Sequence, residues 1–195
     1  MEFIIATGNK GKVKDFNLIL NKLGHSAISL KDIGVEMDVE ETGKTFMENA
    51  YLKAKSIYDI IKKPVIADDS GLCVKALNGR PGVYSARYGG EGLTDKDRCL
   101  KLLDEMETIE DREAKFVCSI CAILSDNDVI ETEGEVCGSL LYEMKGNNGF
   151  GYDPMFFVKE YNKTFGELSD NEKNSISHRR KALDRFVEIL KEKGV

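Results

Sequence analysis

The stretch PVIADDSG, residues 64–71, joins a short apolar run to two adjacent carboxylates and a Ser-Gly pair. Its apolar half predicts a buried strand that ends at Asp68 and Asp69. An uninterrupted apolar run is typical of a strand that is covered on both faces, as in the sheets of α/β proteins. In such sheets, ligand sites gather outside the carboxyl ends of the strands, where we expect this acidic pair.

Strand and helix patterns alternate around this run. Residues 2–6 (EFIIA) predict a buried strand, and residues 27–30 predict a short one, with an apolar helical periodicity between them. Thr45 and Glu48 fit the S/T-x-x-E capping box, so a helix is predicted from Thr45 to about Lys62. Helices are also predicted over residues 94–106 and from Ser177 onward, and residues 114–142 predict a hairpin of two long strands. We therefore expect an α/β protein with a long, twisted, mixed sheet flanked by helices.

The tripeptide Gly43-Lys44-Thr45 looks like the end of a phosphate-binding P-loop. That motif needs a glycine five residues before its Gly-Lys pair, and Asp38 stands there instead. Glu40 and Glu41 would also place negative charge against the phosphates. The segment is therefore interpreted as a loop that precedes the helix from Thr45.

Composition narrows the functional classes. A chain of 195 residues fits one domain, with room for two lobes, and its net charge of -6 argues against binding to a nucleic-acid backbone. Neither a membrane span nor an export signal is expected, and the five cysteines are predicted to be free thiols of a cytoplasmic protein. Cys118 and Cys121 lie three residues apart on a predicted strand and should face opposite sides, which favours structural thiols over a metal or redox pair.

Two polar stretches are candidates for binding phosphate and metal. Residues 7–12 (TGNKGK) lie between a predicted strand and a helix, so their amides and lysines fit a phosphate cradle, or a tight turn with solvated lysines. Asp68 and Asp69 offer hard oxygen ligands that suit Mg²⁺, and Glu40 and Glu41 could add another. A solvated Asp-Asp turn is the alternative.

Two further stretches are candidates for binding a polar ring. Residues 175–181 (SISHRRK) put four potentially cationic side chains in the first turn of a helix, where the dipole disfavours each by about 0.3 to 1 kcal/mol. A bound anion or a polar substrate edge would offset that cost, and Lys173 would add to the same positive patch. Residues 146–154 (GNNGFGYDP) hold aromatic rings between glycines; these fit either stacking on a planar base, with Asp153 accepting hydrogen bonds, or a loop pinned to the core.

Taken together, six motifs along the chain resemble the inosine triphosphate pyrophosphatase family, enzymes that hydrolyse noncanonical purine nucleoside triphosphates such as ITP, dITP and XTP. The motifs are ATGNKGK (6–12), EETGKTFMENAYLKA (40–54), ADDSGL (67–72), GRPGVYSARY (79–88), GNNGFGYDP (146–154) and EKNSISHRRKAL (172–183). The resemblance implies a single domain over residues 1–195, with a sheet between two lobes and a central nucleotide cleft. It also implies a homodimer and Mg²⁺ as the cofactor.

The same resemblance implies roles for individual residues. Glu41 and Asp69 would bind Mg²⁺, and Asp69, with Asp68 beside it, would orient or deprotonate the attacking water; which of the two is the base stays open. Residues that would contact the phosphates or line their site are Thr7, Gly8, Asn9, Lys10, Gly11, Lys12, Lys53 and Ser70. Residues that would form the base pocket are Phe150, Gly151, Tyr152, Asp153, Lys173, His178 and Arg179. Tyr152 stands where some relatives carry tryptophan.

Three other functions fit the sequence less well. A pyrophosphatase for modified pyrimidines or methylated nucleotides would share the metal carboxylates, but the SHR and FGYD motifs argue against it. A nucleotide sensor without hydrolysis predicts the loss of a metal carboxylate or a phosphate lysine, yet Glu41, Asp69 and Lys12 are present. A nucleic-acid-binding module disagrees with the acidic balance of the chain.

Overall fold

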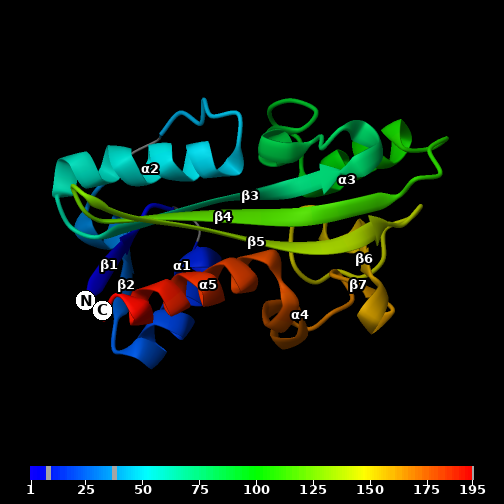
Figure 1. The fold of residues 1–195 in the computed structure, drawn as a ribbon. Coiled ribbons are helices and arrows are strands. Elements are labelled where there is room, and N and C mark those ends of the chain that lie inside the picture. Colours follow the sequence, from blue (N-terminus) through cyan, green and yellow to red (C-terminus); the bar gives the residue numbers. More distant parts are fainter. Residues whose placement is uncertain (8–9, 37–38, 195) are drawn as a thin grey trace. The chain divides into compact units, whose positions relative to one another are not determined.

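The computed structural model describes residues 1–7, 10–36 and 39–194 of the chain. Within these residues, strands form one mixed sheet in the order β2-β1-β3-β4-β5-β6-β7, accompanied by helices (Figure 1). The strands are β1 (Glu2–Ile5), β2 (Ser26–Ser29), β3 (Val65–Val74), β4 (Glu113–Ser125), β5 (Asp128–Leu140), β6 (Phe156–Val158) and β7 (Lys163–Thr164). The α-helices are α1 (Lys10–Leu20), α2 (Phe46–Ile61), α3 (Asp95–Glu105), α4 (Asp170–Ile176) and α5 (His178–Glu192).

The pairing of the strands makes the sheet mixed. Strand β1 runs parallel to both β2 and β3, with Phe3 opposite Ala27 and Ile5 opposite Ile66. At the other edge, β6 runs antiparallel to β5 and to β7. The predicted α/β class with a mixed sheet is therefore confirmed.

The chain divides into two compact units. Unit 1 comprises Met1–Asp69, Cys118–Gly134 and Lys181–Val195, and unit 2 comprises Ser70–Val117 and Glu135–Arg180. Strands β3, β4 and β5 each contribute residues to both units.

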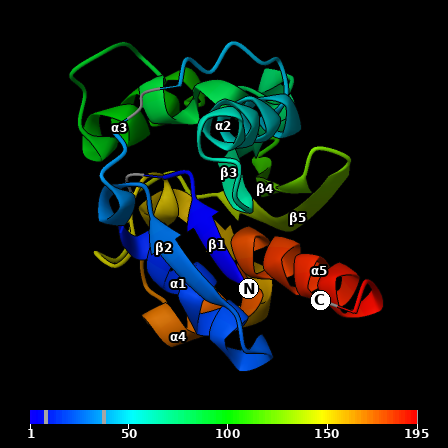
Figure 2. The ribbon, with the colours of Figure 1, turned by 90° about the vertical axis from the view of Figure 1, so that its left-hand side faces the viewer.

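In unit 1 the sheet is covered on both faces. Phe3 and Ile5 of β1 pack with α1 and α5 through Phe16 and Phe186, whereas Ile4 packs in a second cluster with α2. Figures 1 and 2 both show α2 on one side of β1, and α1 and α5 on the other. Burial on both faces explains the unbroken apolar runs of β1 and β3 in the sequence.

Unit 2 has its own core, built on one end of β3, β4 and β5. Leu102 of α3 and Leu72 of β3 belong to it, and so do three phenylalanine rings. The ring of Phe116 lies 4.7 Å from that of Phe156 and 5.8 Å from that of Phe165, measured between centroids. Polar residues of α4 and of the start of α5 lie against this aromatic cluster.

The predicted helix starts agree with the structure. Thr45 caps α2 by accepting a hydrogen bond from Glu48 N at 3.1 Å, and the Glu48 carboxylate accepts one in return, which completes the capping box. Ser169 caps α4 in the same way, and Ser177 Oγ accepts from Arg180 N at the start of α5. Each cap satisfies helix-end amides that have no partner within the helix.

The length of β3 differs from the prediction. The strand does not end at the acidic pair but continues through Asp68 and Asp69 to Val74. One reason is that Leu72 and Val74, beyond the two carboxylates, are again buried. The other is that both carboxylates have polar partners, one on each face of the sheet. The pair therefore lies within a strand, where consecutive side chains point to opposite faces.

The fold also shows where two of the cysteines lie. Cys118 and Cys121 are fully buried and lie in the two opposite clusters of unit 1, which confirms their predicted orientation. Among the described residues, no helix is long and apolar enough to cross a membrane.

Candidate active site

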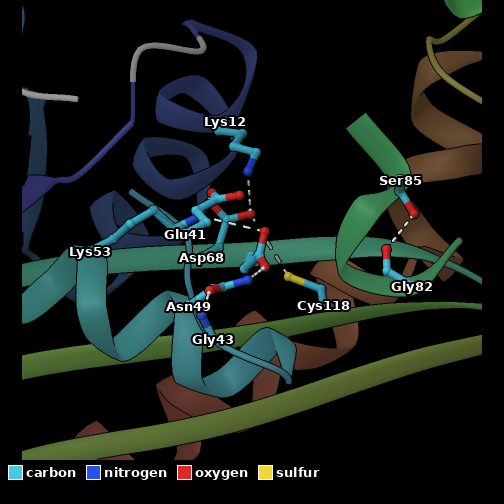
Figure 3. Close-up of polar contacts among 10 residues, drawn as sticks. Lys12, Glu41, Gly43, Asn49, Lys53, Asp68, Gly82, Ser85 and Cys118 are labelled. Atoms are coloured by element: carbon cyan, nitrogen blue, oxygen red, sulfur yellow. Dashed lines mark hydrogen bonds and ion pairs between the residues drawn. The ribbon is translucent and has the colours of Figure 1, made fainter. Parts of the chain in front are cut away.

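Five charged side chains form an acidic cluster in unit 1, where β3 passes between α1 and α2 (Figure 3). They are Lys12, Glu41, Lys53, Asp68 and Asp69. Lys53 projects from α2, and its Nζ lies 2.8 Å from Glu41 Oε1 and 3.5 Å from Asp69 Oδ1. Glu41 comes from the loop that precedes α2. Glu41 and Asp69, the two predicted metal ligands, thus both lie against the same cation, which is the ammonium group of Lys53.

Asp68 has different surroundings from Asp69. Its side chain is fully buried, and its Oδ2 lies 2.8 Å from Nζ of Lys12 on α1. The thiol of Cys118 lies 4.0 Å from the same oxygen. Asp68 therefore faces the side of the sheet that α1 covers, whereas Asp69 faces α2, as the alternation of a strand requires. Two neighbours in sequence are in this way given separate partners.

Burial and charge shape the protonation of this cluster. Burial raises the pKa of Asp69, although the charge of Lys53 and a hydrogen bond from Asn49 oppose that shift. Burial alone would lower the pKa of Lys53, but the charge of Asp69 and the hydrogen bond to Glu41 outweigh it, so the pKa is raised. Lys53 therefore stays protonated as the counterion of both carboxylates.

The cluster suits a hard divalent cation. Glu41 and Asp69 already share one positive charge, and among the five side chains three carboxylates stand against two ammonium groups. Mg²⁺ prefers oxygen ligands, keeps several waters and is usually held by one or two carboxylates together with substrate phosphates. Within the described residues no group of three or more His, Cys, Asp or Glu side chains is placed to hold a metal ion by itself. The arrangement fits a metal shared between protein and substrate better than a closed protein cage.

The predicted phosphate cradle is only partly visible. Gly8 and Asn9 lie outside the described residues, as does the side chain of Lys10. Thr7 follows β1 and its N–H donates to the Ile5 carbonyl at 2.8 Å. Lys12, in the first turn of α1, is a cradle residue whose side chain pairs with Asp68.

In unit 2, the loop after β5 brings together an aromatic ring, an acid and a lysine. The Phe150 side chain is 57% exposed, and Lys173 Nζ of α4 lies 4.6 Å from the centre of its ring. Asp153 accepts a hydrogen bond from Phe150 N at 2.7 Å and pairs with Lys173. Burial raises the pKa of Asp153, while the charges of Lys173 and Arg179 act in the opposite direction.

The rest of that loop is anchored rather than open. Tyr152 is buried in the core of unit 2, and its hydroxyl donates to the Ser85 carbonyl at 2.8 Å. Gly151 N donates to Asp95 at 2.8 Å, and a Cβ at Gly149 would lie 2.0 Å from Asp153 Oδ2. For Tyr152 the structure favours the anchoring interpretation, which leaves Phe150 as the ring available for stacking.

His178 and Arg179 begin α5 and are both buried. The His178 ring stacks on Phe116 with centroids 5.0 Å apart and an interplanar angle of 15°. Asp153 supplies negative charge near Arg179, which offsets part of the cost of cations at a helix start. Ser70, the remaining predicted site residue, follows Asp69 on β3 as the first residue of unit 2.

One residue of the acidic cluster was missed in the sequence. Asn49 is fully buried on α2 and donates to Asp69. The available signal was its position next to the apolar stripe of Phe46 and Ala50, since a buried amide among apolar positions needs hydrogen-bond partners.

Comparison of the sequence with known proteins shows the family to which the chain belongs. The model of the Ham1 family matches residues 3–189. The chain belongs to the Ham1 family. Among the curated relatives of this Ham1 chain, a dITP/XTP pyrophosphatase of Clostridium tetani is 48% identical over 191 residues, which cover 96% of this chain and 95% of the relative. A dITP/XTP pyrophosphatase of Bacillus subtilis is 47% identical over 191 residues, covering 97% and 96% of the two chains.

Solved structures agree with the Ham1 assignment. The Ham1 protein of Staphylococcus aureus is 43% identical, with a TM-score of 0.92 and coverage of 99% of this chain and 100% of that one. A Ham1 protein of Coxiella burnetii is 39% identical, with a TM-score of 0.93 and coverage of 98% and 99%. The fold described above is therefore the fold of Ham1 proteins.

Proposed function

We propose that this Ham1 chain hydrolyses the noncanonical purine nucleoside triphosphates ITP, dITP and XTP to the nucleoside monophosphate and pyrophosphate. The observation that carries the proposal is the convergence of Glu41 and Asp69 on one cation, beside the second pair formed by Lys12 and Asp68. The names of the Clostridium tetani and Bacillus subtilis relatives support the substrate class.

Mg²⁺ is the cofactor of the proposal, with Glu41 and Asp69 as its protein ligands. When bound, it would supply a Lewis acid that withdraws charge from the phosphate oxygens. Lys53 would exchange part of its contact with these carboxylates for a contact with phosphate oxygens. Lys12 and residues 7–11 would hold the remaining phosphate oxygens through ammonium and amide donors.

The chain's own acids then divide the work on water. Asp69, whose side chain keeps 12% exposure, holds a water molecule and accepts its proton. The water oxygen forms a bond to the α-phosphorus, the bond from that phosphorus to the bridging oxygen breaks, and pyrophosphate leaves. Asp68, whose side chain is fully buried and bonded to Lys12, keeps that lysine in place and does not take the proton. On this ground we assign the role of base to Asp69.

Base selectivity is assigned to unit 2. Phe150 stacks on the purine, and Asp153 accepts a hydrogen bond from a ring N–H. Donors from Lys173, His178 and Arg179 favour hypoxanthine and xanthine, which carry a carbonyl at C6, over adenine, which carries an amino group there. Guanine shares that carbonyl, so its rejection needs a further contact at its exocyclic amine.

The proposal includes a setting for the enzyme. Five free thiols agree with a reducing compartment, which we take to be the cytoplasm. On the family resemblance we also propose a homodimer, with the nucleotide as the partner and no role for nucleic acid or membrane.

The experiment is product analysis with Mg²⁺ and a panel of ITP, XTP, dITP, GTP and ATP, with pyrophosphate and orthophosphate quantified separately. The proposal expects pyrophosphate and monophosphate, with ITP and XTP turned over at least about tenfold faster than GTP or ATP. Orthophosphate as the main product would contradict the site of attack. Equal rates for all five nucleotides would contradict the base selectivity.

A further inference from the structure

Asn49 links the two chain segments that carry Asp69 and Glu41. Its side chain is fully buried on the first turns of α2. Its Nδ2 donates to Asp69 Oδ2 at 3.1 Å, and its Oδ1 accepts from Gly43 N at 2.8 Å (Figure 3). A single amide therefore connects β3 to the loop that carries Glu41.

The hydrogen bond from Asn49 distinguishes the two oxygens of Asp69. Oδ2 is held by the amide, and Oδ1 is the oxygen that lies 3.5 Å from Lys53 Nζ and faces the shared cation. A carboxylate that is bonded through one oxygen cannot rotate freely about its terminal torsion. The bond thus keeps Oδ1 directed at the position where Glu41 also points.

The contact with Gly43 fixes the other carboxylate. A Cβ at Gly43 would lie 2.6 Å from Asn49 Oδ1 and 2.9 Å from Asn49 N, so the loop approaches α2 as closely as a glycine allows. Gly43 stands two residues after Glu41, and its own N–H is satisfied by the amide. Asn49 therefore holds the loop at a fixed position against α2.

We propose that Asn49 is a positioning residue of the metal site, which holds Asp69 and the Glu41 loop so that both carboxylates meet at one cation. The inference rests on the proposed function, because it assigns the cation site to Glu41 and Asp69. Groups that orient metal ligands from outside typically contribute about 10- to 100-fold to metal affinity or activity. Asn49 itself touches neither the metal nor the substrate in this account.

The test is Asn49→Ala, with Mn²⁺ alone as the probe of the metal site. The full chain is titrated with Mn²⁺ without nucleotide, and free Mn²⁺ is quantified by electron paramagnetic resonance. We expect Asn49→Ala to weaken Mn²⁺ binding by at least about tenfold. With ITP, kcat should fall by a similar factor while KM for ITP changes less, because the base and phosphate contacts are intact.

Asn17→Ala is the matched control. Asn17 also lies on a helix of unit 1, where its amide donates to the Ala27 carbonyl at 2.7 Å and accepts from Ala27 N at 2.8 Å. The control loses the same two kinds of hydrogen bond, away from the carboxylates. It should lose stability, followed by thermal unfolding, but keep the Mn²⁺ affinity of the wild type.

Gly43→Ala keeps the test decisive if Asn49→Ala does not fold. It retains Asn49, Glu41 and Asp69 and disturbs only their spacing, so Mn²⁺ binding should again weaken. Unchanged Mn²⁺ affinity in the folded variants would overturn the positioning role and leave the proposed function standing. Failure of the wild-type chain to bind Mn²⁺ alone would also overturn the positioning role, whereas failure to turn over any nucleotide of the panel would overturn the proposed function.

Discussion

At Asp69 two requirements meet in one side chain. The carboxylate is largely buried, which disfavours its charge, and yet it contacts Lys53 and accepts from Asn49, which favour that charge. Asp68, one residue earlier, is buried more completely and paired with Lys12. The alternation of β3 is what separates the two acids, because neighbouring strand residues face opposite sides of the sheet.

The substitution Asp69→Asn should abolish turnover. It keeps the shape of the side chain but removes the charge that would bind the cation and the base that would take the proton, so kcat is expected to fall by at least about 100-fold. Asp59→Asn is the control, because Asp59 is an exposed acid on α2 that pairs with the surface lysines Lys55 and Lys62. Steady-state kinetics with ITP, together with circular dichroism, make the comparison. Wild-type turnover by Asp69→Asn would remove this residue from the mechanism.

The thiols offer a second prediction at the residue scale. Burial raises the pKa of Cys99 and of Cys121 to about 12, whereas Cys137 is exposed. Since the thiolate is the reactive form, iodoacetamide should label Cys137 in the folded chain and leave Cys99 and Cys121 unlabelled until denaturant is added. Peptide mass spectrometry after timed labelling measures this. Labelling of Cys121 as fast as that of Cys137 would contradict the described packing of unit 1.

Among the elements, α2 shows what sequence patterns can and cannot predict. Its start at Thr45, its end near Lys62 and its apolar stripe followed from the capping box and the helical spacing. The pairing of Lys53 with Glu41 and Asp69 did not follow, because spacing along a helix does not say which distant strand or loop lies opposite. The same limit concealed Asn49, whose partners come from β3 and from the loop at Gly43.

Strand β3 and the loop after β5 show a second limit. The acidic pair resembled the end of a strand because local polarity is typical of turns, yet partners from α1 and α2 allowed the strand to continue. In the loop, Phe150 lies between two glycines and Tyr152 lies beside one. The sequence alone does not distinguish which of the two rings is buried. A hydrogen bond from Tyr152 to the Ser85 carbonyl decides it.

The loop makes a prediction at the element scale. Phe150→Ala should raise KM for ITP by about tenfold through loss of stacking, with a smaller effect on kcat. Tyr142→Ala is the control, since Tyr142 is also an exposed aromatic of unit 2 with a cation, Arg112, over its ring. Steady-state kinetics of the two variants should differ accordingly. A KM for ITP unchanged by Phe150→Ala would exclude Phe150 from the base pocket.

For the whole molecule, the proposed chemistry and the proposed base recognition fall to different units of the chain. The residues proposed to bind metal and activate water lie in unit 1, and those proposed to bind the base lie in unit 2. Six motifs spread along the sequence could suggest this function together, because most of them contain residues of the proposed metal site or of the proposed base pocket. Their grouping by unit needed the structure, since both units are assembled from separate segments of the chain.

The proposed homodimer is a prediction at the same scale. Size-exclusion chromatography with light scattering should give a mass twice that of the 21.8 kDa chain at micromolar concentration. The mass should not depend on added Mg²⁺, because no metal ligand of the proposal comes from a second copy. A mass equal to one chain over the whole concentration range would contradict the dimer.

The central claim is that water attacks the α-phosphorus of the nucleotide at a site built from Glu41 and Asp69. Its most direct test is hydrolysis of ITP with Mg²⁺ in water enriched in heavy oxygen, followed by mass spectrometry of both products. The account predicts that the heavy oxygen appears in the monophosphate and not in pyrophosphate. Heavy oxygen in pyrophosphate, or in released orthophosphate, would contradict it.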